Sequence, residues 1–299
     1  MNNVKKVFGI KDLENLSGIK AHTIRIWEKR YNLLSPERTD TNIRNYSLAS
    51  LQKLLNITLL YNNGYKISKI AKMGEVKITG IVKEIIAGNS VKDHAISSFK
   101  LAMINFDRIL FHNTCAALLE NRSFDEVFKT IFIPLLNELG LLWQTDTIRL
   151  SHEHFISNLI KEKIHVHLEK VASQEPLRKD KTFVLFLPEN EIHEIGLLYL
   201  SYEVALKGYK SIYLGQTVPL ESLEDFTKFF TNVTFISYFT VEPAKDKMDK
   251  YIKTFQSRLG RNNASTLWLL GYQTQYLNAE KMPENIKLFN SIDEVTQAL

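Results

Sequence analysis

The sequence predicts a multidomain protein in which two helical domains precede an α/β domain with a parallel sheet. Residues 1–80 carry 14 Lys and Arg against 6 Asp and Glu, whereas residues 81–299 carry 24 against 27. Apolar residues recur at helical spacing over residues 79–176, and short β-branched or aromatic runs alternate with helical patterns over residues 177–299. This order favours a basic helical domain, a helical bundle and a doubly wound sheet.

The composition is that of an ordinary globular protein of a reducing compartment. The chain of 299 residues is 44% hydrophobic and 24% charged, and it has one cysteine, Cys115. A single cysteine excludes an internal disulfide and a zinc site built from several cysteines. The first eight residues lack the apolar core of a signal peptide, and the run from Ile131 to Trp143 is too short to span a bilayer. We therefore expect a cytoplasmic protein.

Residues 1–78 predict a small domain that contains a helix-turn-helix. A first helix over residues 10–16 stops at Gly18, and a second helix covers residues 21–31. The polar segment 34–47 follows and has the length of a hairpin, so the domain is expected to be an all-α winged helix-turn-helix. Its basic charge suits a polyanionic partner.

Residues 79–176 predict a helical bundle. The segment 105–119 carries an apolar face, another helix is expected before Pro134, and residues 151–171 form a long amphipathic helix. Gly88-Asn89-Ser90 interrupts the helical pattern near its start. Antiparallel helices of this kind form a bundle that can cap a neighbouring domain.

Residues 177–299 predict a Rossmann-like (flavodoxin-like) domain with a parallel sheet of five strands, entered through a polar linker at residues 173–181. His193 lies on the turn between the first strand and the helix that follows it. In an open parallel sheet that turn is at the carboxyl edge, where ligands bind. Later strands end near Ser237 and Gly271, which converge on the same edge, so the topology predicts a ligand site there.

The N-terminal motif resembles the winged helix-turn-helix of the MerR family, and it is most similar to the Arg-x-Trp-Glu-x-Arg-Tyr branch. The residues that carry the resemblance are Arg25-Ile26-Trp27-Glu28-Lys29-Arg30-Tyr31, Leu34, Pro36, Arg38, Arg44 and Tyr46. The family usually has Gly where this chain has Asn42, and Asn also tolerates a left-handed turn. For Trp27 the interpretation as a core aromatic is favoured over a functional one.

The MerR resemblance implies binding to a double-stranded DNA operator with inverted half-sites by a homo-oligomer, either a dimer or a tetramer. In the family the second helix faces the major groove and the hairpin contacts the phosphate backbone and the minor groove. The residues implied to bind DNA are His22, Thr23, Arg25, Arg30, Arg38, Arg44 and Tyr46.

Two further motifs resemble those of cobalamin-binding proteins. Glu191-x-His193-x-x-Gly196 is similar to the Asp/Glu-x-His-x-x-Gly signature of cobalamin-binding Rossmann-like domains, in which the His ligates cobalt from below. Trp143, followed after nine residues by Glu153-His154, resembles the helical cap of the CarH, CarA and LitR group of light-responsive repressors. The resemblance implies a cobalamin, with adenosylcobalamin favoured, whose cobalt is ligated by His193. The implied cofactor-binding residues are Trp143, Glu153, His154, Glu191, His193, Gly196, Ser237 and Gly271.

These resemblances imply a transcriptional regulator, a repressor and not an enzyme, whose operator binding responds to cobalamin and through it to light. Two departures leave alternatives open: Gln144 stands where some members of the group have His, and Tyr272 stands where a second Gly is common. One alternative is a MerR-type regulator with a degenerate sensor domain that no longer binds cobalamin. Another is a cobalamin-dependent methyltransferase or mutase module, although the chain has no length left for a substrate barrel.

Overall fold

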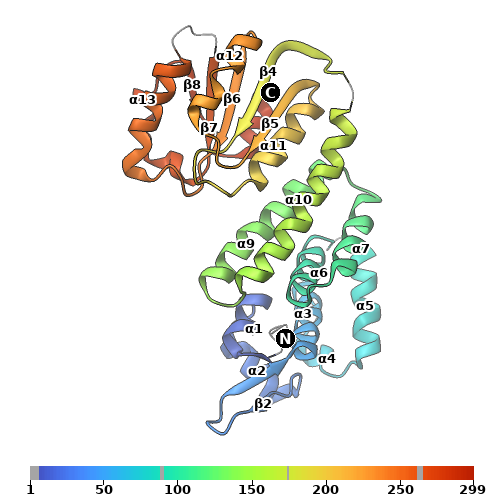
Figure 1. Cartoon of the computed structure of the whole chain (residues 1–299). Coiled ribbons are helices and arrows are strands. Elements are labelled where there is room, and N and C mark those ends of the chain that lie inside the picture. Colours follow the sequence, from blue (N-terminus) through green and yellow to red (C-terminus); the bar gives the residue numbers. More distant parts are fainter. Residues whose placement is uncertain (1–6, 88–90, 174, 261–264) are drawn as a thin grey trace. The chain divides into compact units, whose positions relative to one another are not determined.

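The computed structural model describes residues 7–87, 91–173, 175–260 and 265–299. It separates into two compact units, Met1–Leu159 and Ile160–Leu299 (Figure 1), which are described in turn. The finer division into three domains at residues 78/79 and 176/177 stays a prediction, and the interruption expected at residues 88–90 lies outside the described residues. In the described part of the chain, no helix is both long enough and apolar enough to cross a membrane.

The N-terminal part of the first unit contains the expected helix-turn-helix and hairpin, together with a small antiparallel sheet of order β1-β3-β2. The hairpin strand β3 also pairs with the start of the chain, which the sequence did not predict. Asn42, at the hairpin tip, adopts the left-handed conformation with φ 64°, so it replaces the glycine as expected. The elements are β1 (Val7–Phe8), α1 (Ile10–Ser17), α2 (Ala21–Tyr31), β2 (Glu37–Arg38), β3 (Arg44–Ser47), α3 (Leu48–Asn62) and α4 (Ile67–Ile70).

Helix caps and a buried aromatic pair stabilise this small domain. Gly18 ends α1 in the left-handed conformation, which glycine adopts without steric cost because it has no Cβ. Ser47 caps α3 by accepting a hydrogen bond from the Ser50 amide. Trp27 is buried and packs edge to face on Tyr61, with ring centroids 5.1 Å apart. The interpretation of Trp27 as a core aromatic is therefore confirmed.

The rest of the first unit is a helical bundle. Its elements are α5 (Glu75–Ala87), α6 (Val91–Asn105), α7 (Arg108–Leu119), α8 (Phe124–Val127), the π-helical turn η1 (Phe128–Phe132), α9 (Ile133–Gln144) and the start of α10 (Leu150–Ala172). A helix beginning at residue 105 was expected, but Phe106 has φ 53° and Asp107 caps α7 instead. Pro134 does not end the helical run, because it lies in the first turn of α9, where no amide donor is needed.

The second unit is built on a five-stranded parallel sheet of order β5-β4-β6-β7-β8, which confirms the predicted topology. Helices α11 and α14 pack on one face of the sheet, and α12 and α13 pack on the other (Figure 1). The elements are β4 (Arg178–Phe186), α11 (Ile195–Leu206), β5 (Tyr209–Gly215), η2 (Leu220–Leu223), α12 (Phe226–Phe229), β6 (Val233–Tyr238), η3 (Lys245–Lys247), α13 (Met248–Leu259), β7 (Ser265–Leu270), η4 (Tyr272–Tyr276), η5 (Ala279–Lys281), β8 (Ile286–Leu288) and α14 (Ile292–Ala298).

The predicted linker is shorter than expected, because residues 178–181 already belong to β4. Arg178 pairs with Tyr209 on the neighbouring strand, and its guanidinium lies 3.9 Å from the centroid of that ring. A polar sequence can therefore form a strand here through backbone pairing and stacking, which its composition alone does not reveal.

Candidate functional site

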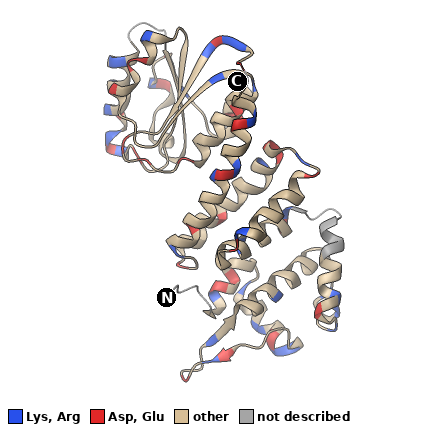
Figure 2. Ribbon diagram, turned by 45° about the vertical axis from the view of Figure 1, so that its right-hand side comes forward, with Lys and Arg blue, Asp and Glu red and all other residues tan. Residues whose placement is uncertain are grey.

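The outer face of α2 presents the residues expected to read DNA. Ile24 and Trp27 are buried and fix this helix on the domain core. His22 and Arg25 lie on the opposite side and are exposed, Thr23 is half-buried, and Arg30 is exposed in the last turn. In Figure 2 basic and acidic residues colour the β2–β3 hairpin and the helices beside it.

The hairpin arginines are organised by one carboxylate. Arg38 and Arg44 are directly paired across β2 and β3. Arg44 Nε lies 3.1 Å from both carboxylate oxygens of Glu28, and an Arg38 nitrogen lies 4.0 Å from the same group. Arg38 also donates to Asn42 Oδ1 at 2.5 Å. Glu28 therefore offsets the repulsion between two like charges on one face of the hairpin.

Tyr46, which the resemblance implied to bind DNA, lies inside the small domain. Its side chain is fully buried, and its hydroxyl donates to Glu28 Oε2 at 3.0 Å. Burial raises the pKa of Tyr46, and the Glu28 carboxylate raises it further. The ring thus supports the hairpin from inside, and its contact with DNA stays a prediction. Glu28 accepts hydrogen bonds from both Arg44 and Tyr46. It was not predicted as a functional residue, although it belongs to the Arg-x-Trp-Glu-x-Arg-Tyr motif.

In the second unit, the turn after β4 is built around Glu191. This residue is fully buried, although it carries a carboxylate. Glu191 Oε2 accepts the backbone amides of Thr240, Val241 and Glu242 at 3.2, 2.6 and 2.9 Å. Oε1 accepts the amides of Ile192 and His193 at 2.9 and 3.0 Å. One side chain thus joins the turn after β4 to the turn after β6.

Glu191 also holds the ring of His193, whose Nδ1 lies 2.5 Å from Glu191 Oε1. Burial by itself would raise the pKa of Glu191, but the His193 ring and the surrounding amides outweigh it and hold the pKa at about 2. The carboxylate is therefore ionised, and the side chain of His193 is 53% exposed at the carboxyl edge of the sheet. An ionised partner on Nδ1 favours the tautomer in which Nε2 can bind a metal.

Exposed apolar side chains border His193 in the turns of the same edge. Ile192 precedes it, Val241 follows the amides held by Glu191, and Tyr272 follows β7 with 66% of its surface exposed. Gln216 donates to the Ile192 carbonyl at 3.1 Å, and Gln273 donates to the Val241 carbonyl at 3.0 Å. Sequence reasoning missed Ile192 and Val241, since isolated apolar residues in loops carry no signal. Exposed apolar side chains at the edge that presents this half-exposed imidazole suit a flat ligand that binds through a metal.

Close packing within the chain explains why two positions of the predicted site, Gly196 and Gly271, are glycines. A Cβ on Gly196 would come within 2.8 Å of the Tyr238 ring. Gly271 has φ 108°, and a Cβ there would come within 2.5 Å of the Phe239 carbonyl oxygen. Both glycines are therefore required by the packing of β6 against its neighbours. Contact of either glycine with a cofactor stays a prediction.

Ser237, whose contact with a cofactor stays a prediction, lies inside the sheet. The residue is fully buried, and its hydroxyl donates to the Phe186 carbonyl at 2.9 Å. It stabilises the adjoining ends of β4 and β6 and does not present a polar group at the edge.

The remaining predicted cofactor residues belong to the first unit. Trp143 lies near the end of α9 and is 54% exposed, and Leu141 and Leu150 nearby are exposed as well. Glu153 Oε2 lies 2.7 Å from His154 Nδ1, and Glu153 Oε1 accepts a hydrogen bond from Ser157 at 2.6 Å. The end of the bundle thus presents a large aromatic surface together with a polar Glu153–His154 pair.

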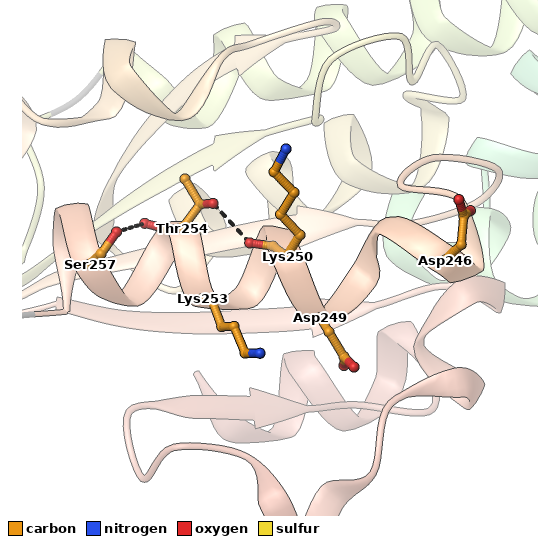
Figure 3. A pocket seen from close by; sticks show the side chains of 6 residues that line it. All are labelled: Asp246, Asp249, Lys250, Lys253, Thr254 and Ser257. Carbon is orange, nitrogen blue, oxygen red and sulfur yellow. Dashed lines mark hydrogen bonds between the residues drawn. The ribbon is translucent and has the colours of Figure 1, made fainter.

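A shallow surface pocket occurs elsewhere, on η3 and α13. Its lining residues come from a single stretch of chain, carry charges of both signs and point in different directions (Figure 3): Asp246, Asp249, Lys250, Lys253, Thr254 and Ser257. This is the solvated face of one helix, and it offers no group like His193.

Two family models match the chain. The model described as MerR HTH family regulatory protein matches residues 8–75, and the model described as B12 binding domain matches residues 95–166. The chain therefore contains one segment similar to MerR-type helix-turn-helix proteins and one segment similar to B12-binding domains. The second match extends from α6 to α10 and so includes Trp143, Glu153 and His154.

Two curated relatives that cover most of the chain are named as transcriptional repressors. The chain is 28% identical over 229 residues to the HTH-type transcriptional repressor CarH of Myxococcus xanthus, covering 73% of this chain and 74% of that protein. It is 24% identical over 218 residues to the repressor CarA of the same organism, covering 72% and 70%.

Among solved structures, the monomethylamine corrinoid protein of Methanosarcina barkeri superposes with a TM-score of 0.56 at 11% identity. The superposition covers 69% of this chain and 97% of that chain. At this level of identity the likeness shows the fold, which is that of a helical region followed by a Rossmann-like parallel sheet.

Proposed function

We propose that the protein is a DNA-binding transcriptional repressor, and not an enzyme, whose operator binding is controlled by a cobalamin. The observation that carries the proposal is the union, on one chain, of a MerR-type reader domain and a B12-binding domain followed by a sheet edge that presents His193. The similarity to the repressors CarH and CarA supports the same function.

His193 is the proposed ligand of cobalt. Its Nδ1 is engaged by an ionised, fully buried Glu191, so Nε2 would bind the metal. Glu191 in turn is held by five backbone amides from two turns, which gives the imidazole a fixed direction. The exposed Ile192, Val241 and Tyr272 would contact the apolar face of the macrocycle.

Trp143 is the proposed cover for the opposite face of the cofactor. The exposed Trp143, Leu141 and Leu150 offer an apolar surface that excludes water, and Glu153 with His154 could hydrogen-bond an upper adenosyl group. Bound adenosylcobalamin would supply a light-sensitive cobalt–carbon bond. Light would then change DNA binding only if the cofactor favours one conformation or assembly over the other.

The reader domain is proposed to act as a homo-oligomer on inverted half-sites. A winged helix-turn-helix places one recognition helix in one major groove, so two copies related by symmetry would read two inverted half-sites. The exposed His22, Arg25 and Arg38 are the side chains that would face DNA most directly.

The test is retention of cobalamin. The purified protein is mixed with adenosylcobalamin in the dark, freed of unbound cofactor, and its visible spectrum is recorded beside those of His193→Ala and His165→Ala. His165 is an exposed histidine of α10 and serves as the matched control. Retained colour in the wild type and in His165→Ala, with an altered or lost spectrum in His193→Ala, is expected. A colourless wild type would favour the regulator with a degenerate sensor, and turnover of a methyl donor by the loaded protein would favour an enzyme.

A further inference from the structure

Glu194, the residue that follows His193, is held between a strand and a helix. Its Oε1 accepts a hydrogen bond from Lys161 Nζ at 3.1 Å, and its Oε2 accepts one from the Tyr213 hydroxyl at 2.9 Å. Tyr213 lies on β5 and Lys161 lies on α10. The two oxygens of one carboxylate therefore connect the sheet to α10 immediately beside His193.

The cluster is protected from solvent more than an ordinary surface ion pair. The side chains of Glu194 and Lys161 are 17% and 27% exposed. Burial raises the pKa of Tyr213, and the Glu194 carboxylate raises it further, so the phenol stays protonated and remains a donor. Partly buried charges are screened less than exposed ones, which favours a lasting contact over a transient one.

The cluster fixes the second side of the His193 turn. On the first side, Glu191 is bonded to the turn after β6. On the second side, the Glu194 carbonyl accepts the Leu198 amide at 2.8 Å and so starts α11, while its carboxylate is tied to β5 and α10. His193 thus lies between two anchored residues, and a metal ligand needs such support to keep its direction.

Lys161 belongs to the same helix, α10, as Ser157 and Glu153. Lys161 follows Ser157 by four residues and Glu153 by eight, and residues at this spacing share one face of an α-helix. Ser157 and Glu153 are hydrogen-bonded to each other at 2.6 Å. The helix that carries the proposed upper-face residues therefore also carries the lysine that holds the His193 turn.

We infer that Lys161, Glu194 and Tyr213 form a positioning cluster that sets the direction of His193 toward cobalt and links that direction to α10. The inference rests on the proposed function, because it takes His193 as the cobalt ligand. The cluster has no part in binding the cofactor directly. It determines what fraction of the bound cobalamin is ligated by His193.

The test measures ligation by spectroscopy. Protein labelled with ¹⁵N-histidine is loaded with cob(II)alamin, and the nitrogen splitting in its electron paramagnetic resonance spectrum reports whether a histidine is bound. We expect Lys161→Met and Tyr213→Phe to lower the His-ligated fraction and to raise the cobalamin dissociation constant by about tenfold. Lys161→Arg, which keeps the charge, should restore most of the ligation. Lys170→Met, an exposed lysine of the same helix, is the control and should behave as wild type.

The outcomes separate this inference from the function on which it rests. Wild-type protein that binds cobalamin with a histidine, together with full ligation in Lys161→Met and Tyr213→Phe, would overturn the inference alone. Wild-type protein that binds no cobalamin would overturn both. If Lys161→Met fails to fold, Tyr213→Phe removes a single hydroxyl and decides the question. In cofactor-free protein, faster hydrogen exchange at the amides of residues 192–194 in these variants is also expected, and unchanged exchange would count against the inference.

Discussion

Asn15 of α1 donates a hydrogen bond from its side-chain amide to Thr147 Oγ1 at 2.7 Å, and a second to Thr145 Oγ1 at 3.2 Å. Both threonines lie in the turn after α9, the helix that carries Trp143. The helix-turn-helix is therefore bonded directly to the segment proposed to cover the cofactor. A displacement of Trp143 would reach the DNA-reading domain through this turn without any intervening element.

The Asn15–Thr147 contact should be measurable as a coupling energy. Asn15→Ala removes both hydrogen bonds, and we expect the free energy of unfolding to fall by about 1 kcal/mol. In a double-mutant cycle with Thr147→Val, the two losses should not add, since each removes the same bond. Urea unfolding of the four proteins provides the measurement, and strictly additive losses would show that the contact contributes nothing.

Lys100 provides a second connection between α1 of the helix-turn-helix and α9. Its ammonium donates to the Leu16 carbonyl at 3.2 Å, at the end of α1, and pairs with Glu138 of α9. The side chain of Lys100 is 9% exposed and that of Glu138 is 41% exposed. Glu138→Gln therefore leaves a buried charge without its counterion and should cost about 2 to 3 kcal/mol, whereas Lys100→Met leaves an accessible carboxylate and should cost less.

The stabilities of Glu138→Gln and Lys100→Met are compared through the midpoints of their urea unfolding curves. The comparison holds when the dependence of the unfolding free energy on urea has the same slope in both variants. Lys92→Met, an exposed lysine on the same helix as Lys100, is the control and should change the midpoint little. A larger loss for Lys100→Met than for Glu138→Gln would contradict the assignment of the buried partner.

Substitutions at Arg25 and Glu28 should distinguish residues that contact DNA from residues that stabilise the fold. Arg25 is exposed on α2, so Arg25→Ala should weaken operator binding by about 1 to 3 kcal/mol and leave unfolding nearly unchanged. Glu28→Gln should instead lower stability by about 1 to 3 kcal/mol, because Arg44 and Tyr46 lose their charged acceptor. Arg44→Ala should do both. Fluorescence anisotropy with a labelled duplex over a salt series measures operator affinity, and urea unfolding measures stability. A loss of stability in Arg25→Ala as large as that in Glu28→Gln would be contrary to the exposed position of Arg25.

His94 should make the stability of the bundle depend on pH. Burial lowers the pKa of His94 below the ordinary value of a histidine. The unfolded chain therefore takes up this proton first as the pH falls, so this contribution is complete above the unfolded pKa and is lost as the pH falls toward the folded pKa. Urea midpoints should drop between about pH 8 and about pH 5.5, and the drop should be smaller in His94→Gln. An unchanged pH dependence in that variant would mean that other groups cause it.

Much of the architecture follows from local patterns. The end of α1 at Gly18 and the parallel strands were all predicted, because capping, glycine and apolar periodicity act over a few residues. The position of His193 at a carboxyl edge also followed, since in a doubly wound sheet the turn after a strand always lies there. The break at Phe106 was missed, because its left-handed conformation has no signal in the residue type.

The sequence by itself determined the order of the elements, the basic charge of the reader domain and the candidate ligand His193. Only the tertiary structure decided which polar side chains face solvent. Tyr46 turned inward because Glu28, eighteen residues earlier in the chain, accepts its hydroxyl, and Ser237 turned inward because the Phe186 carbonyl lies beside it. The same holds for Glu191 and Glu194, whose amide, lysine and tyrosine partners come from distant turns and strands. A hydrogen bond or ion pair forms only when the fold brings two groups together, and the sequence does not show which distant groups it brings together.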